Sequence, residues 1–173
     1  SLSLLPSHDY VPRALDDRVG YFETMYQDYT NTLQETQYVR FINRWNLIKK
    51  DKYAELSDPV EPIVFWIDNK VPKEFRPAIR EGALAWNEAF ERIGFKNAIV
   101  VKQMPDDATW DPADVRYNTI RWFIQPGSAY AVGPSRANPF TGELYDADIR
   151  ISADFVKAFY REFDEFVTPV TDE

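Results

Sequence analysis

The stretch from residue 63 to residue 101 limits the possible folds of this chain more than any other. It opens with a continuous β-branched and aromatic run, Ile63-Val64-Phe65-Trp66-Ile67, which is typical of a strand covered on both faces. Apolar residues then recur at steps of three and four from Phe75 to Ile93 and predict an amphipathic helix. Residues 98–101 predict a second strand. A strand, a long helix and a strand in this order indicate a sheet with the helix packed on one face.

Other parts of the chain add strands and a second helix to this unit. Extended segments are expected over residues 37–47, 119–125, 129–133 and 147–152, and a helix is expected whose apolar stripe contains Phe155, Phe159, Phe163 and Phe166. Prolines at 59 and 62 mark a boundary, because proline disfavours helix in the residue before it. The expected fold is α+β: a twisted mixed β-sheet of about five strands backed by a long helix over residues 58–173. An extended N-terminal arm, or the end of an upstream region, is expected over residues 1–57.

Composition excludes several classes of protein and site. Apolar residues make up 45% of the chain and aromatics 16%, which argues against disorder. With 28 acidic and 20 basic side chains the net charge is -8, so neither nucleic acid nor an anionic membrane is an expected partner. Mean hydropathy is -0.46 and no apolar run is long enough for a membrane span. There is no cysteine and one histidine, His8, so we expect the isolated chain not to bind zinc tightly.

Acidic and hydroxyl side chains offer weak candidates for chemistry. The acidic candidates fall into three groups: Glu81, Glu88 and Glu91; Asp106, Asp107, Asp111 and Asp114; and Asp146 and Asp148. The first group is a solvated helix face or a source of general acid–base groups, and the second is a polar loop or a weak calcium site without EF-hand spacing. The third group binds a cation or caps a turn. Ser128 and Ser135 lack a nucleophile elbow, so the residues alone indicate no self-contained catalytic site.

A series of short sequence motifs, taken in their order and spacing, is more informative than any of them singly. They are Arg18-Val19-Gly20-Tyr21-Phe22, Arg44-Trp45-Asn46-Leu47, Pro62-Ile63-Val64-Phe65-Trp66-Ile67-Asp68, Phe75-Arg76-Pro77, Trp86-Asn87-Glu88-Ala89-Phe90, Gly94-Phe95-Lys96-Asn97, Trp110-Asp111-Pro112, Ile120-Arg121-Trp122, Gly133-Pro134-Ser135, Thr141-Gly142-Glu143 and Ala147-Asp148-Ile149. With them, the run from residue 59 to residue 151 resembles the N-terminal half of a zincin domain, and more narrowly the large bacterial zinc-dependent, metzincin-like metallopeptidases.

The resemblance implies peptide-bond hydrolysis by the intact protein. In that family two histidines of an H-E-x-x-H helix hold zinc and the glutamate between them is the general base. This chain contains no such motif, so we expect a fragment without the catalytic half, which would need zinc and the remainder of its own polypeptide to act. Similar proteins suggest a periplasmic or extracellular location.

The resemblance also implies where a substrate peptide binds. In zincin sheets the short strand before the final one pairs with the bound peptide, and that strand corresponds to Ala129, Tyr130, Ala131, Val132 and Gly133. An edge strand offers unpaired N–H and C=O groups to an extended peptide whatever the family. We expect the small residues 129, 131 and 133 to admit the peptide backbone, and Tyr130 and Val132 to anchor the strand. The alternative is a non-catalytic module of α+β fold that recognises protein or glycan.

Overall fold

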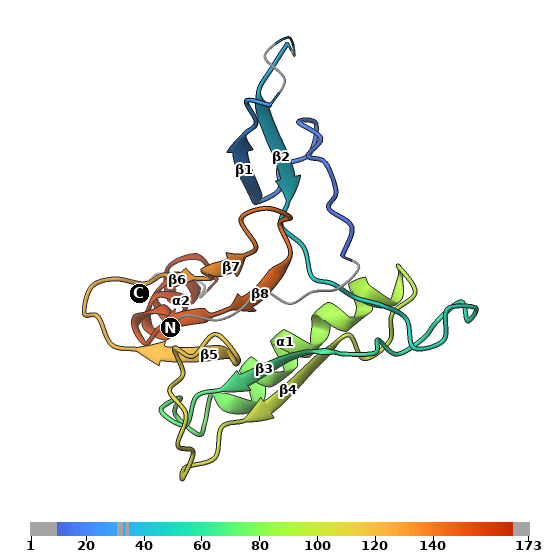
Figure 1. Ribbon diagram of the computed structural model, residues 1–173. Coiled ribbons are helices and arrows are strands. Elements are labelled where there is room, and N and C mark those ends of the chain that lie inside the picture. The colour runs from blue at the N-terminus through green and yellow to red at the C-terminus, as the bar shows by residue number, and fades with distance from the viewer. Residues whose placement is uncertain (1–9, 31–32, 34, 168–173) are drawn as a thin grey trace, which may run out of the picture.

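The main sheet of the computed structural model has five strands. The structure describes residues 10–30, 33 and 35–167 (Figure 1). The order of the strands across the sheet is β4 (Ile99–Gln103), β3 (Ile63–Ile67), β5 (Asn118–Phe123), β9 (Ile149–Ser152) and β6 (Ala131–Val132). The first four strands are mutually parallel, and β6 runs antiparallel to β9 at one edge. The α+β fold with a mixed five-stranded sheet is therefore confirmed.

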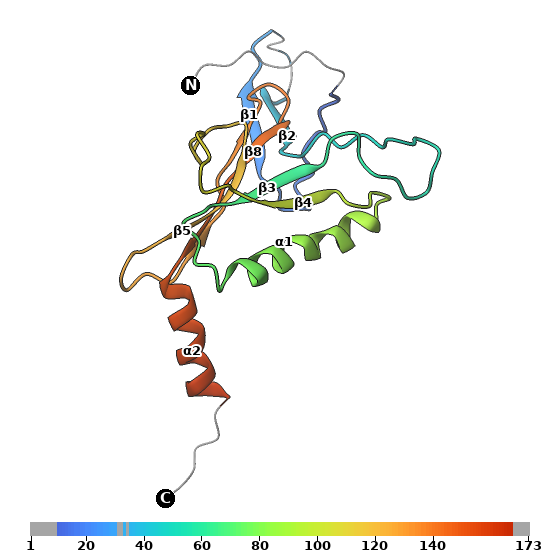
Figure 2. The ribbon, with the colours of Figure 1, turned by 90° about the horizontal axis from the view of Figure 1, so that it is seen from below.

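The long helix α1 (Arg76–Glu91) lies along one face of β3 and β4 (Figure 2). Pro77 stands in its first turn, where the missing N–H costs no helical hydrogen bond. Alternate residues of β3 are buried beneath the helix, and Ile67 is fully shielded from solvent. Ile79, Ala83 and Phe90 of α1 pack against this core. These α1 side chains are only partly buried, so each contributes less than the about 1.5–3 kcal/mol of full burial, and together they hold the helix on the sheet.

Two small two-stranded sheets accompany the main one. The first pairs β1 (Glu23–Gln27) with β2 (Tyr38–Ile42), both within residues 1–57. The second pairs β7 (Ser135–Ala137) with β8 (Leu144–Ala147) in a hairpin between β6 and β9. Its turn closes through Gly142, whose φ of 75° favours glycine and where a Cβ would lie 2.5 Å from the carbonyl oxygen of Ile42.

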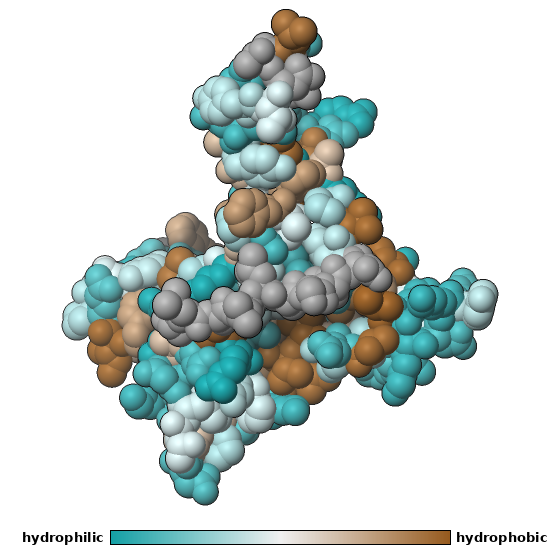
Figure 3. Space-filling model, in the orientation of Figure 1, coloured by the Kyte–Doolittle hydropathy of each residue, from teal (hydrophilic) through white to brown (hydrophobic). Residues whose placement is uncertain are grey.

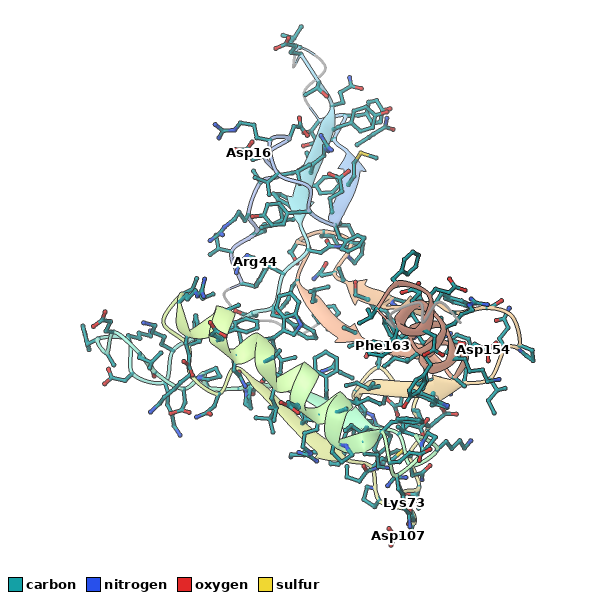
Figure 4. The ribbon with its side chains drawn as sticks, turned by 180° about the vertical axis from the view of Figure 1, so that it is seen from behind. Asp16, Arg44, Lys73, Asp107, Asp154 and Phe163 are labelled. Atoms are coloured by element: carbon teal, nitrogen blue, oxygen red, sulfur yellow. The ribbon has the colours of Figure 1, made fainter. Side chains whose placement is uncertain are left out.

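The second helix, α2 (Asp154–Phe166), projects away from the sheet and contains no buried residue (Figure 2). Its apolar stripe stays exposed, with Phe159 59%, Phe163 57% and Phe166 81% accessible; Figure 4 marks Phe163 on this helix. A second apolar surface, a groove of about 550 Å³, lies between α1 and the sheet and is lined among others by Trp86, Ile120 and Ile151. Hydrophobic residues gather over this region in Figure 3. In the part of the chain that the structure describes, no helix is long and apolar enough to cross a membrane.

Candidate functional site

The strand β6 is the antiparallel edge of the main sheet. Ala131 pairs with Ile151 and Val132 with Arg150 in the ladder to β9. Beyond the two strand residues, the N–H of Ser152 donates to the carbonyl of Tyr130 at 3.1 Å and the N–H of Asp148 donates to the carbonyl of Pro134 at 2.9 Å. The even-numbered residues of this segment therefore direct their backbone groups towards β9.

The odd-numbered residues direct theirs the other way. Backbone groups of successive residues in an extended strand point to opposite sides, so the N–H and C=O of Ala131 and Gly133 face outwards. No strand described in the structure lies beyond β6, and residues 129–136 are exposed. A Cβ at Gly133 would meet only the carbonyl oxygen of Asp148, at 3.8 Å, so the sheet face above this residue is sterically open. The segment thus presents two donors and two acceptors at positions where an added strand would need them.

Side chains beside the edge form a shallow cavity of about 250 Å³ on the sheet face opposite α1. It is lined by Arg121, Trp122, Phe123, Tyr130, Val132 and Arg150. The rings of Phe123 and Tyr130 lie 5.2 Å apart, and the Tyr130 hydroxyl donates to Gln125 Oε1 at 3.1 Å. Tyr130 holds β6 against the preceding strand through this contact, while 42% of its surface remains exposed. Val132, which is 45% exposed, stands next to Arg150.

Two carboxylates fix the elements that surround β6, one at the start of β9 and one at the start of α2. Asp148 is buried, and its Oδ1 accepts hydrogen bonds from the Thr119 hydroxyl at 2.8 Å and the Thr119 N–H at 3.3 Å, which fixes the start of β9 against β5. Asp154, at the start of α2 (Figure 4), accepts from the Gly127 N–H at 2.6 Å. That hydrogen bond, together with the nearby Lys157 ammonium, keeps the pKa of Asp154 below its ordinary value. The turn that leads into β6 is therefore tied to the helix that follows β9.

The five residues predicted for the site are brought together, although only Ala131 and Val132 lie within β6. Ala129 and Tyr130 precede the strand and Gly133 follows it. The acidic candidates lie elsewhere: Glu81, Glu88 and Glu91 are exposed on α1, and Asp106 and Asp107 are exposed in a loop.

The remaining acidic candidates each have a partner in the fold. Asp114 pairs with Arg116, whose guanidinium hydrogen bonds lower the pKa of Asp114 to about 2. Asp146 is buried in an ion pair with Arg136 across the β7–β8 hairpin. Among the described residues, no three His, Cys, Asp or Glu side chains gather to hold a metal ion. His8, the one histidine of the chain, lies outside the described residues.

Sequence reasoning missed the two arginines of the cavity. Arg121 and Arg150 each follow an isoleucine, and the register of β5 and β9 pairs Ile120 with Ile149 and Arg121 with Arg150. The repeated Ile-Arg pair in two expected strands was the available signal. Alternation along a strand places the isoleucines on the α1 face and both arginines on the other.

Comparison with known proteins gives one result. The family model described as Domain of unknown function (DUF5117) matches residues 1–50, a segment that contains β1 and β2 and ends before the main sheet. No curated protein and no solved structure matches the chain.

Proposed function

We propose that this chain binds an extended peptide along the outer side of β6 and forms the N-terminal, substrate-cleft part of a zinc-dependent metalloprotease. The observation that carries the proposal is the outward direction of the Ala131 and Gly133 backbone groups at an exposed sheet edge. An incoming strand would pair with these groups without displacing any hydrogen bond of the β6–β9 ladder.

The arrangement of elements supports the protease part of the proposal. The resemblance of the sequence to zincins implies a mixed sheet, a long helix behind it and a short strand, preceding the last one, that receives the substrate. The chain has α1 behind β3 and β4, and β6 precedes β9 while lying beside it at the edge. Zinc and its general base would come from a part of the polypeptide other than the residues described. The same resemblance underlies a proposed periplasmic or extracellular location.

The apolar surfaces support a second contact, with the remainder of the same polypeptide. The 550 Å³ groove beside α1 and the phenylalanine stripe of α2 are contiguous apolar surfaces. Such surfaces differ from the single apolar residues that are scattered over any protein, and they indicate a contact. Covering the groove would place additional structure on the α1 face, opposite the arginine cavity. The peptide edge would remain accessible from its own side.

Ala131→Pro tests the peptide edge most sharply, because proline removes the outward N–H. The probe is a blocked hexapeptide of alternating threonine and valine, and binding to the chain is measured by calorimetry. We expect Ala131→Pro to weaken binding by roughly 1–3 kcal/mol, since one peptide carbonyl loses its donor. Ala131→Ser, which keeps the N–H, is the matched control and should bind as the parent does.

The same variants separate binding from catalysis. Circular dichroism confirms that each variant folds, and zinc content and peptide hydrolysis are measured on the complete gene product. Unchanged affinity in a folded Ala131→Pro variant would disprove the edge assignment. Peptide binding with no hydrolysis by the complete gene product would overturn the protease part and leave a non-catalytic interaction module.

A further inference from the structure

Arg121 and Arg150 form an unusual pair of like charges. They are register partners on adjacent parallel strands, so their side chains leave the same face of the sheet side by side. Like charges at directly neighbouring positions of a sheet are unfavourable. The chain as a whole carries a net charge of -8, so this pair is a local basic spot in an acidic protein.

The pair has only partial compensation within the protein. Arg121 Nε lies 3.7 Å from Oδ2 of Asp68, a buried carboxylate at the end of β3. Asp148, the acidic residue immediately before β9, accepts a hydrogen bond from the Thr119 hydroxyl at 2.8 Å. Among the described residues Arg150 forms no ion pair, and its side chain is exposed at the cavity next to Val132. One guanidinium is therefore available to an anionic group from outside.

The position of the pair relative to β6 specifies which part of a bound peptide would meet it. Neighbouring strands lie about 4.8 Å apart, so a peptide on the outer side of β6 would run about 10 Å from β9. Side chains of directly opposed residues share a face, so the peptide residue opposite Val132 would project over the cavity. Arg150 can extend from β9 across the small Val132 side chain, and a glutamate of the peptide can extend towards it. Together the two side chains span the distance of about 10 Å between the peptide and β9.

We infer that the peptide recognised by β6 carries a glutamate side chain opposite Val132, with Arg150 as its ion-pair partner and Arg121 as a secondary one. The inference rests on the proposed function and adds a class of substrate to it: acidic peptides in extended conformation. Tyr130 and Val132 of the edge segment line the same cavity and offer apolar surface to the methylene groups of that glutamate, and the Arg150 guanidinium would donate hydrogen bonds to its carboxylate.

The test compares two blocked hexapeptides that differ only in a central glutamate or glutamine. Calorimetry with the full chain should give roughly 5-fold tighter binding of the glutamate peptide at low salt, a ratio that shrinks as salt rises from about 50 to 300 mM. Arg150→Gln should bring the ratio close to one, because the glutamate peptide loses its ion-pair partner. Arg92→Gln, which removes an exposed arginine at the C-cap of α1, is the matched control and should retain the ratio.

The outcomes distinguish the two proposals. If both peptides bind the parent equally, or if Arg150→Gln retains the preference, the acidic-peptide inference is overturned while the edge assignment stands. If the peptides bind with a glutamate preference that Ala131→Pro does not weaken, the arginines bind the peptide but β6 does not. If neither peptide binds, both proposals fail.

Discussion

The two edges of the main sheet differ in what their outward backbone groups contact. At the β4 edge, α1 supplies side chains that take the place of a further strand: Asn87 Nδ2 donates to the carbonyl of Ile99 at 2.9 Å, and Asn87 Oδ1 accepts from its N–H at 2.8 Å. Arg80 donates to the carbonyl of Val101 at 2.6 Å. At the β6 edge, the described residues include no side chain that bonds the outward groups of Ala131 or Gly133.

The difference shows how one sheet can be protected at one edge and available at the other. Sheet edges invite pairing with other chains, and proteins normally cover them. A helix that follows its strand directly, as α1 follows β3, lies close enough to reach the backbone of β4 with short polar side chains. Among the residues that the structure describes, the edge strand β6 has no such neighbour, and its exposed segment runs from residue 129 to residue 136.

The largest expected effect on stability comes from removing the Asn87 side chain that bonds the β4 edge. Asn87→Ala should lower the free energy of unfolding by about 2 kcal/mol, because the Ile99 N–H and C=O, which are partly buried, both lose their partner. Urea denaturation measures this change. Glu88→Ala, on the exposed side of the same helix turn, removes only a surface pair with Arg92 and should stay within about 0.5 kcal/mol of the parent. Equal effects of the two variants would show that Asn87 does not protect β4.

A smaller difference in stability is expected between proline variants on the inward and the outward side of β6. Val132→Pro removes an N–H that faces β9 and should destabilise the chain by about 1 kcal/mol, whereas Ala131→Pro removes an outward N–H and should change stability by less than about 0.5 kcal/mol. The two variants are compared by thermal unfolding. If Ala131→Pro proved the more harmful, the alternation of inward and outward groups along β6 would be wrong.

The smallest expected effect is a pH dependence of the Asp154–Gly127 hydrogen bond, which lies beside the β6 edge and has no counterpart at Asn87. Because the folded-state pKa of Asp154 is lowered, its hydrogen bond to Gly127 is present above the unfolded-state value and is lost as the pH falls through the lower folded-state value. The Gly127 amide resonance should therefore shift with a midpoint below 3.8, the ordinary value for aspartate. Asp154→Asn should abolish this transition. The Ile99 amide, bound by the non-titrating Asn87, should not shift over the same range.

Much of the main sheet could be predicted from the sequence because its signals are long and local. The continuous run of β3 and the stripe of α1 gave bounds close to those observed, and the α2 stripe was also helical as predicted. The strand expected over residues 37–47 is shorter, Tyr38–Ile42, and beyond it Arg44 forms only an isolated bridge with Glu143. The strands β7 and β8 were not predicted, since their short, partly exposed segments gain a register only by pairing with each other.

The candidate site was only partly predictable for the same physical reason. The small residues and the following Pro134 indicated an edge strand at 129–133. That Arg121 and Arg150 meet beside it depends on the parallel register of β5 and β9, which is a long-range property. The capping of β4 by Asn87 depends likewise on how α1 lies over the sheet, and the spacing of α1 residues alone does not determine it.

Site-resolved amide exchange tests the open β6 edge most directly. In the free chain the amides of Ala131 and Gly133 should exchange rapidly and that of Ile99 slowly. Saturation with the glutamate hexapeptide should slow exchange at Ala131 and Gly133 and leave Val132, already bonded towards β9, unchanged. Slow exchange of Ala131 and Gly133 in the free chain, or no slowing in the saturated complex, would contradict the assignment of β6 as a peptide-binding edge.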